Sequence, residues 1–214
     1  MTTFANPDIV RWNEKYRSAE TMGQTPHPSA PLIQPKGEAE LVSHLPKPTE
    51  PGALALEVAC GRGANALYLA RQGYEVIAMD GSLTGLMNCA HGARHYQLPV
   101  YPVVVDLNEV ILPKSHFSMI SVVRYLQRGL IDSLINALQS GGIVFYKTFS
   151  YHYLKSKPTF NPEFVLQKGE LLSWFDGFEI MATNADERAS RTSSDSFDGQ
   201  ETIQTSHYVL ARKL

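Results

Sequence analysis

The sequence predicts an α/β fold in which helices cover both faces of a seven-stranded, mostly parallel sheet with one antiparallel strand. Three observations predict it. Apolar, strand-like runs alternate with helix-like segments over most of the 214 residues, a pattern typical of parallel sheets. A glycine-rich turn joins the first of these runs to a helix within residues 54–67. The last two strands have only a loop between them, which implies an antiparallel pair.

The chain opens with a helix and a proline-rich stretch. Asn6 is a capping residue and Pro7 follows it at the first helical position, so a helix is expected from here to about Arg17. Four prolines then interrupt residues 26–35, and a short helix is expected at about 38–45.

The remaining elements follow from hydrophobic runs and turn residues. The expected strands are 54–57, 74–80, 100–106, 118–123, 143–149, 178–183 and 202–212. The expected helices are 64–72, 82–97, 127–139 and 170–175. Ser82 is the expected cap of the second of these helices, and Gly141 and Gly142 are expected to end the third. Residues 150–168 show no clear period, and residues 185–200 are interpreted as an exposed loop.

The glycine turn is typical of the front of a nucleotide-type binding site, where a buried strand meets a helix. Gly61, Gly63 and Ala66 fit the dinucleotide fingerprint, which tolerates Ala at its third position. Glu57 argues against a dinucleotide, because its carboxylate ends the strand and would repel a pyrophosphate. S-adenosylmethionine has an ammonium, a sulfonium and no phosphate, so Glu57 would help to hold it, directly or through water. An NAD-binding oxidoreductase is therefore disfavoured.

Two further acids end the next two expected strands. Asp80 lies seventeen residues beyond Gly63, the length of one helix and one strand, and can accept two hydrogen bonds from ribose hydroxyls. Asp106 ends the third strand and can accept a hydrogen bond from the amino group of adenine. A single acid at a strand end is more often a cap or a solvated turn. Three in succession, the first tied to a glycine loop, favour a cofactor site.

The segment from Glu57 to Gly63 resembles motif I of the class I S-adenosylmethionine-dependent methyltransferases, which have a Rossmann-like fold. Asp80 and Asp106 fall where that family places its ribose and adenine acids. The resemblance implies S-adenosylmethionine as cofactor and S-adenosylhomocysteine as product. It also implies a set of cofactor-binding residues: Arg17, Glu57, Ala59, Gly61, Gly63, Asp80, Gly81, Ser82, Asp106, Leu107 and Val123.

A narrower resemblance is to the tellurite-resistance (TehB-like) branch. It rests on residues 12–17 near the N-terminus and on residues 161–166 and 169–172 near the C-terminus. The wider resemblance covers about residues 52–213. Ser118 departs from it, since the family usually has an acid before the fourth strand. That acid is mostly structural, so cofactor binding is still expected.

Composition favours a compact enzyme that acts on a small molecule. One domain is expected over residues 1–214, with residues 1–51 as a lid or cap and residues 52–214 as the catalytic core. The formal net charge is −2 and no basic cluster occurs, so no nucleic-acid partner is expected. Two cysteines form no disulfide framework, and no signal peptide or membrane-length apolar run occurs. We therefore expect a cytoplasmic monomer or homodimer without a membrane partner.

Candidate catalytic residues are few. His152 follows the fifth strand and is the best candidate for a general base, although a surface histidine is the commoner case. Tyr125 follows the fourth strand, where it can shape the acceptor pocket. Arg17 can pair with the methionine carboxylate of the cofactor, or can simply favour the end of its helix. His91 and His95 have the spacing of a metal pair, but no third ligand is evident, so no metal is expected.

Two functions from different classes remain open at this point. The first is a methyltransferase whose acceptor is small and soft or anionic, such as tellurite, selenite or a thiol, because such nucleophiles need no protein base. The second is a non-catalytic module that binds S-adenosylmethionine as a sensor or within an assembly. The sequence favours the first, since residues 150–168 and the N-terminal segment supply enough chain to close a pocket.

Overall fold

The computed structural model describes residues 6–20, 32–185 and 204–214. Seven strands form one sheet in the order β3-β2-β1-β4-β5-β7-β6. They are β1 Leu54–Val58, β2 Glu75–Asp80, β3 Val100–Val104, β4 Phe117–Val123, β5 Leu138–Phe149, β6 Phe178–Thr183 and β7 Ser206–Lys213. Strands β1 to β5 run parallel, and β7 is antiparallel to both of its neighbours. The predicted α/β class with one reversed strand is confirmed.

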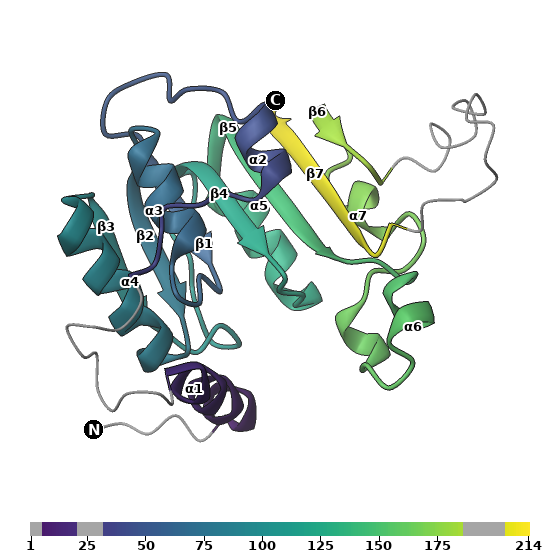
Figure 1. The fold of residues 1–214 in the computed structure, drawn as a ribbon. Coiled ribbons are helices and arrows are strands. Elements are labelled where there is room, and N and C mark those ends of the chain that lie inside the picture. The colour runs from purple at the N-terminus through teal and green to yellow at the C-terminus, as the bar shows by residue number, and fades with distance from the viewer. Residues whose placement is uncertain (1–5, 21–31, 186–203) are drawn as a thin grey trace, which may run out of the picture.

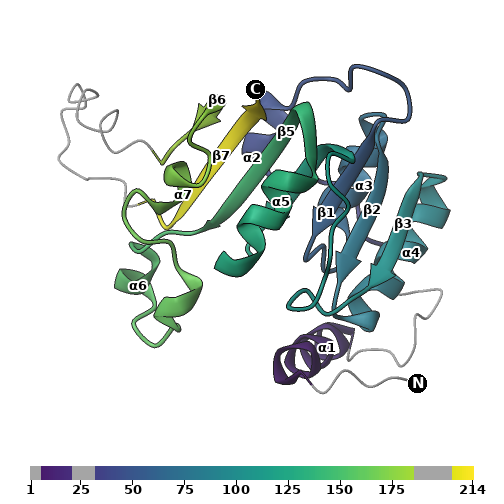
Figure 2. The same ribbon diagram turned by 180° about the vertical axis from the view of Figure 1, so that it is seen from behind.

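Helices pack on both faces of this sheet. They are α1 Pro7–Glu20, α2 Ala39–His44, α3 Ala64–Arg71, α4 Leu83–Tyr96, α5 Ile131–Ala137, α6 Tyr153–Ser156 and α7 Glu170–Ser173, with 3-10 turns η1 Arg128–Leu130 and η2 Pro162–Phe164. Helices α2, α3 and α4 lie in front of the sheet in Figure 1, and α5 lies in front of it in the reverse view of Figure 2. No helix among the described residues is both long and apolar enough to cross a membrane.

Alternation along the strands divides the core into two layers. Ala55 packs with α3 and α4, whereas Leu56 and Val58 pack with α5 on the other face. Because successive side chains of a strand point to opposite faces, Glu57 points to the α3 side. That side also carries Met119 and Phe145 of the neighbouring strands.

The strand order reverses at β1, whose neighbours are β2 on one side and β4 on the other. In open α/β sheets the carboxyl ends of the strands at such a point form the ligand-binding crevice. Helix α1 lies across this end of the sheet in both views (Figures 1 and 2). The role of the N-terminal segment as a lid stays a prediction.

The structure corrects the boundary between the third core helix and the fifth strand. We expected a helix over 127–139 that Gly141 and Gly142 would end. Instead α5 ends at Ala137, and β5 already begins at Leu138, which pairs with Phe117. The pairing register shifts between Phe117 and Met119, so these glycines lie in an irregular part of the strand rather than at a helix end. A left-handed Gly141 suits such an irregularity as well as it suits a helix end.

Smaller differences occur elsewhere. Residues 150–168, which show no clear period in the sequence, contain the short helix α6 and the turn η2. The third strand ends at Val104, two residues before Asp106, and the last strand begins only at Ser206. The expected loop at 185–200 lies almost wholly outside the described residues. The other strands and helices begin and end within a few residues of their expected positions.

Candidate functional site

The loop after β1 has a backbone that is unusual for its residues. Ala59, Gly61 and Gly63 have φ angles of 53°, 54° and 87°, all in the left-handed region. Glycine adopts this region without strain, but Ala59 does not, and such strain is typical of functional loops. The N–H of Gly63 donates to the carbonyl oxygen of Cys60 at 2.9 Å, which closes the turn into α3.

Each of the two glycines of this loop lies against a side chain of another helix, which leaves no room for a Cβ. A Cβ at Gly61 would lie 2.5 Å from the hydroxyl oxygen of Tyr16 on α1. A Cβ at Gly63 would lie 2.3 Å from Sγ of Cys89 on α4. Hydrogen bonding to Cys89, together with burial, raises the pKa of the Cys60 thiol. A raised thiol pKa lowers reactivity, so this pair favours a packing role for Cys60 over a nucleophilic one.

Asp80 is the last residue of β2 and accepts a hydrogen bond from the glycine loop. Its Oδ2 accepts the N–H of Gly61 at 2.7 Å, and its Oδ1 accepts the N–H of Ser82 at 2.7 Å. Burial raises the pKa of Asp80, and these two hydrogen bonds oppose the rise. A carboxylate has about four acceptor positions, so Asp80 keeps two that these N–H groups do not use. Ser82 also caps α4 as expected, because its hydroxyl accepts the N–H of Gly85.

Glu57 is 2% exposed and its Oε2 has no hydrogen-bond partner among the described residues. Burial raises the pKa of Glu57 to about 8, although the side chains of Ser121 and Asn65 oppose the rise. The negative charge of Glu38 adds to it. Glu57 is therefore mainly protonated in the free protein at pH 7. The sequence alone suggested a charged carboxylate here, and burial is the reason for the difference.

Helix α1 and the residue before it contact the strand-end loops through side chains for which the sequence predicted no role in the site. Nδ2 of Asn6 donates to Oδ2 of Asp106 at 3.2 Å. Oδ1 of Asn13 accepts the hydroxyl of Ser82 at 2.8 Å. The ring of Tyr16 lies against Gly61, and burial followed by the charge of Asp80 raises its pKa. Local sequence patterns contain no signal for these contacts, since the partners are far apart along the chain.

Asp106 lies just beyond β3 and is more exposed than Asp80. Its carboxylate accepts the N–H of Asn108 and the side-chain amide of Asn6, which lower its pKa, the Asn108 N–H most strongly. It is therefore charged at neutral pH. Leu107 beside it is buried in the core cluster that includes Leu112.

Other predicted cofactor residues occupy varied positions. Gly81 faces α1, where a Cβ would lie 2.7 Å from Ile9. Val123 is partly buried at the end of β4. Arg17 is exposed, so its pairing with a cofactor carboxylate stays a prediction.

The two candidate catalytic residues lie after different strands, Tyr125 after β4 and His152 after β5. Tyr125 is half-buried, and its hydroxyl donates to Oε1 of Gln127. Its pKa is raised by burial and then by the charges of Asp106 and Asp80. His152 lies at the start of α6, with its ring 4.1 Å from that of Tyr151. Its Nδ1 has no hydrogen-bond partner among the described residues.

No group of three or more potential metal ligands occurs among the described residues. Of the possible metal pair, His95 packs edge-on against Tyr96 on the same helix.

A model of the family described as "Tellurite resistance protein TehB" matches residues 40–196, more than two thirds of the chain. The chain belongs to the TehB family. The narrower of the two resemblances in the sequence is therefore confirmed.

Solved structures with the same architecture include three methyltransferases. An S-adenosylmethionine-dependent methyltransferase from Mesorhizobium loti aligns with a TM-score of 0.59 and 18% identity, covering 81% of this chain and 96% of its own. TehB from Haemophilus influenzae aligns with a TM-score of 0.63 and 16% identity, and the alignment covers 94% of this chain and 67% of that protein. The third is geranyl diphosphate C-methyltransferase from Streptomyces coelicolor A3(2), solved with Mg²⁺, geranyl diphosphate and S-adenosyl-L-homocysteine. It aligns with a TM-score of 0.65 and 14% identity, and the alignment covers 99% of this chain and 100% of that protein. At identities this low, the structural likeness shows the fold alone.

One curated relative matches a smaller region. Hemagglutinin 1 from Eikenella corrodens is 31% identical over 87 residues, which cover 40% of this chain and 29% of that protein. The match therefore spans less than a third of the relative. By family the chain is a TehB protein, and its fold is that of solved S-adenosylmethionine-dependent methyltransferases.

The residues at the carboxyl end of the sheet fit that cofactor. Glu57 offers a buried oxygen without a partner, Asp80 retains acceptor positions, and Asp106 is charged. At Gly61 the hydroxyl of Tyr16 lies where a Cβ would be, so α1 packs directly on the glycine loop. This set of acceptors suits a ligand with an ammonium, ribose hydroxyls and an amino group.

Proposed function

We propose that this protein transfers a methyl group from S-adenosylmethionine to a small soft or anionic acceptor, such as tellurite, selenite or a thiol. The observation that carries the proposal is the gathering of Glu57, Asp80 and Asp106 around the glycine loop at one end of the sheet. Membership of the TehB family supports the choice of acceptor. A cytoplasmic setting is part of the proposal, and the free cysteines support it.

Each acid has a separate task in this proposal. Asp80 accepts the ribose hydroxyls, Asp106 accepts the adenine amino group, and Glu57 faces the ammonium group. The other cofactor residues of the proposal are Arg17, Ala59, Gly61, Gly63, Gly81, Ser82, Leu107 and Val123. When bound, S-adenosylmethionine supplies a methyl group on a sulfonium, which is already a good leaving group.

The protein then contributes mainly positioning and the exclusion of water. Helix α1 covers the strand ends through Asn13 and Tyr16 and keeps water from that side. Tyr125 shapes the wall toward the acceptor. A thiolate, selenite or tellurite attacks with its own lone pair, so no side chain has to remove a proton.

Calorimetric titration with S-adenosylmethionine, S-adenosylhomocysteine and NAD tests the cofactor. We expect binding of the first two and none of NAD. Tight binding of NAD would reverse the proposal.

A methyl-transfer assay with tellurite, selenite, thiols and simple amines tests the acceptor, using wild type and His152→Ala. We expect His152→Ala to lower turnover by less than about tenfold, whereas loss of a true general base typically costs about a hundredfold or more. His95→Ala, a histidine on α4, is the matched control. Activity confined to amines or alcohols, or a much larger loss in His152→Ala, contradicts the soft-acceptor proposal. Cofactor binding without turnover of any acceptor would favour a sensor.

A further inference from the structure

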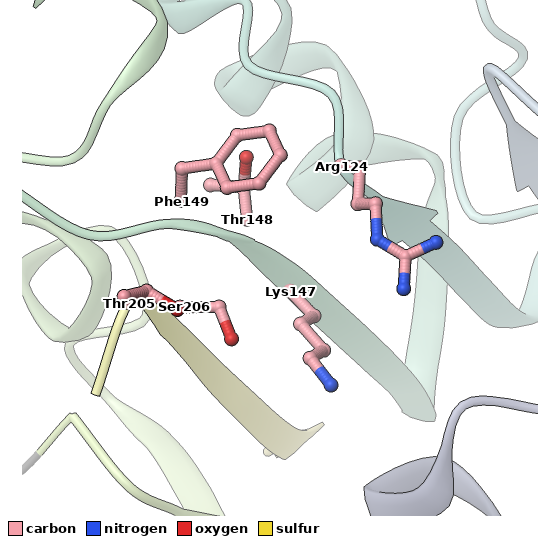
Figure 3. A pocket seen from close by; sticks show the side chains of 6 residues that line it. All are labelled: Arg124, Lys147, Thr148, Phe149, Thr205 and Ser206. Carbon is pink, nitrogen blue, oxygen red and sulfur yellow. The ribbon is translucent and has the colours of Figure 1, made fainter. Parts of the chain in front are cut away.

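A cavity of about 200 Å³ lies at the carboxyl ends of β4 and β5, beside the first residues of β7. Its wall consists of Arg124, Lys147, Thr148, Phe149, Thr205 and Ser206 (Figure 3). Two of these residues are cationic, three carry hydroxyl groups, and none of them is acidic. A cavity of this size admits only a small molecule, because drug-sized ligands occupy about 300 Å³ or more.

Arg124 is held at this cavity by an unusual backbone. Its φ of 56° is left-handed, a conformation that a long side chain rarely adopts. Its N–H donates to the carbonyl oxygen of Lys147 at 2.8 Å, which ties the turn after β4 to β5. The side chain is nevertheless 63% exposed. Strain of this kind persists only where the surroundings impose it, often at a functional site.

The acids that balance the two cations belong to the segment at the start of α2, outside the cavity wall. Oε1 of Glu38 lies 2.9 Å from Nη2 of Arg124, and its Oε2 lies 2.9 Å from Nζ of Lys147. Oε2 of Glu40 lies 2.6 Å from the same Nζ. A guanidinium has five N–H donors and an ammonium has three, so both cations keep donors for a ligand. The acids therefore orient the cations without filling the cavity.

The cavity lies at the same edge of the sheet as the glycine loop, because β4, which Arg124 follows, is the direct neighbour of β1. The N–H of Glu38 donates to Oδ1 of Asn65 at 2.9 Å, and Asn65 is in the first turn of α3, after the glycine loop. Arg124 is followed directly by Tyr125, whose pKa reflects the charges of Asp106 and Asp80. A molecule in the cavity would thus lie next to the elements that hold the cofactor.

We propose that this cavity is the acceptor subsite and that Arg124 and Lys147 bind an anionic group on the acceptor. This inference rests on the proposed function. The group is a carboxylate or an inorganic oxyanion, since a guanidinium donates two parallel hydrogen bonds to either. Ser206 and Thr205 offer further donors at the start of β7. The acceptor is therefore selenite or tellurite itself, or a small thiol that also carries a carboxylate.

Two thiols with the same reacting group separate charge recognition from chemistry. Wild type should prefer 3-mercaptopropionate, which has a carboxylate, over the neutral 2-mercaptoethanol. In Arg124→Asn, whose new side chain tolerates left-handed backbone, KM for 3-mercaptopropionate should rise at least about tenfold. KM for 2-mercaptoethanol and the Kd for S-adenosylhomocysteine should change less than about twofold. Arg212→Asn, which removes a cation paired with Glu179 on β6, is the matched control.

Binding measurements cover the case in which neither thiol is methylated. 3-Mercaptopropionate and selenite are titrated separately into protein saturated with S-adenosylhomocysteine. Binding of selenite alone assigns the subsite to inorganic oxyanions, and binding of the thiol assigns it to organic carboxylates. In either case Arg124→Asn should abolish the heat of binding.

Three results would overturn the inference: no preference of wild type for the anionic thiol, an equal loss with both thiols in Arg124→Asn, or no binding of either anion to wild type. Failure of S-adenosylhomocysteine to bind would instead refute the proposed function. The same anion titrations with the free protein would then still test the cavity.

Discussion

The carboxylates at this site differ in their structural tasks. Asp80 accepts the N–H groups of Gly61 and Ser82 and so supports the glycine loop. Among the described residues, the carboxylate of Asp106 accepts hydrogen bonds only from Asn108 in its own turn and from Asn6 before α1. The two acids looked equivalent in the sequence, because each follows an apolar run. The structure separates them by burial.

The first prediction contrasts Asp80→Ala with Asp106→Ala. Both variants should bind S-adenosylhomocysteine more weakly by about 1–3 kcal/mol, the cost of hydrogen bonds lost from a charged acceptor. Only Asp80→Ala should also lower the free energy of unfolding by about 1–3 kcal/mol, since it leaves the buried N–H groups of Gly61 and Ser82 without an acceptor. Calorimetry and urea denaturation measure the two effects. Unchanged affinity in Asp80→Ala would remove this residue from the site.

The second prediction concerns the protonation of Glu57. Burial raises its pKa to about 8, so the folded protein holds this proton more tightly than the unfolded chain does. Its contribution to stability is complete below about pH 4 and is lost as the pH rises toward 8. As the pH rises over this range, the unfolding free energy of wild type should therefore fall relative to that of Glu57→Gln. Parallel stability curves for the two proteins between pH 5 and 8.5 would show that Glu57 is not protonated.

At the scale of elements, helix α1 is the part that links the N-terminal segment to the site. It contacts the loops after β2 and β3 through Asn13 and Asn6, and the glycine loop through Tyr16. These contacts are few compared with those of α3 and α4, which pack into the core. The helix is therefore expected to open more easily than the rest of the fold.

The third prediction is that cofactor binding protects α1. Hydrogen exchange of the amides from Trp12 to Arg17 should slow when S-adenosylhomocysteine is added, because the ligand gives the helix a further surface to pack on. The amides of β4, which pair on both sides within the sheet, are the control and should not change. Equal protection of the α1 amides with and without ligand would rule out the lid.

At the scale of the whole molecule, the parallel sheet brings the strand-end loops to one edge, and α1 lies across that edge (Figure 1). The reversal of strand order at β1 is what separates the loops after β1 and β4 enough to hold a ligand. The site is thus a property of the topology as much as of its residues.

The fourth prediction is that S-adenosylhomocysteine stabilises the whole fold. At a hundred times its Kd, a ligand that binds only the folded state adds about 2.7 kcal/mol. For a chain of this size, that corresponds to a rise in Tm of roughly 5–10 °C. NAD at the same concentration should give no shift. An equal shift with both compounds would mean that the site does not discriminate against a dinucleotide.

The sequence by itself determined the local features of this protein. The glycine turn, the acids at the strand ends, the Ser82 cap and the antiparallel final pair all follow from residue types at short spacing, because these features depend on nearby backbone geometry. The irregular start of β5 was not foreseen, since Gly141 serves a helix end and a strand irregularity equally well. Here pairing with β4 decided between two locally acceptable structures.

Only the tertiary structure decided which side chains meet and which are charged. Lys147 contacts Glu38 and Glu40, and Asn6 contacts Asp106, across about a hundred residues of chain. Such contacts leave no periodic signal in the sequence, because they arise when separate elements pack. The proton on Glu57 has the same origin, since it depends on burial between β1, β4 and α3 rather than on the neighbouring residues in the chain.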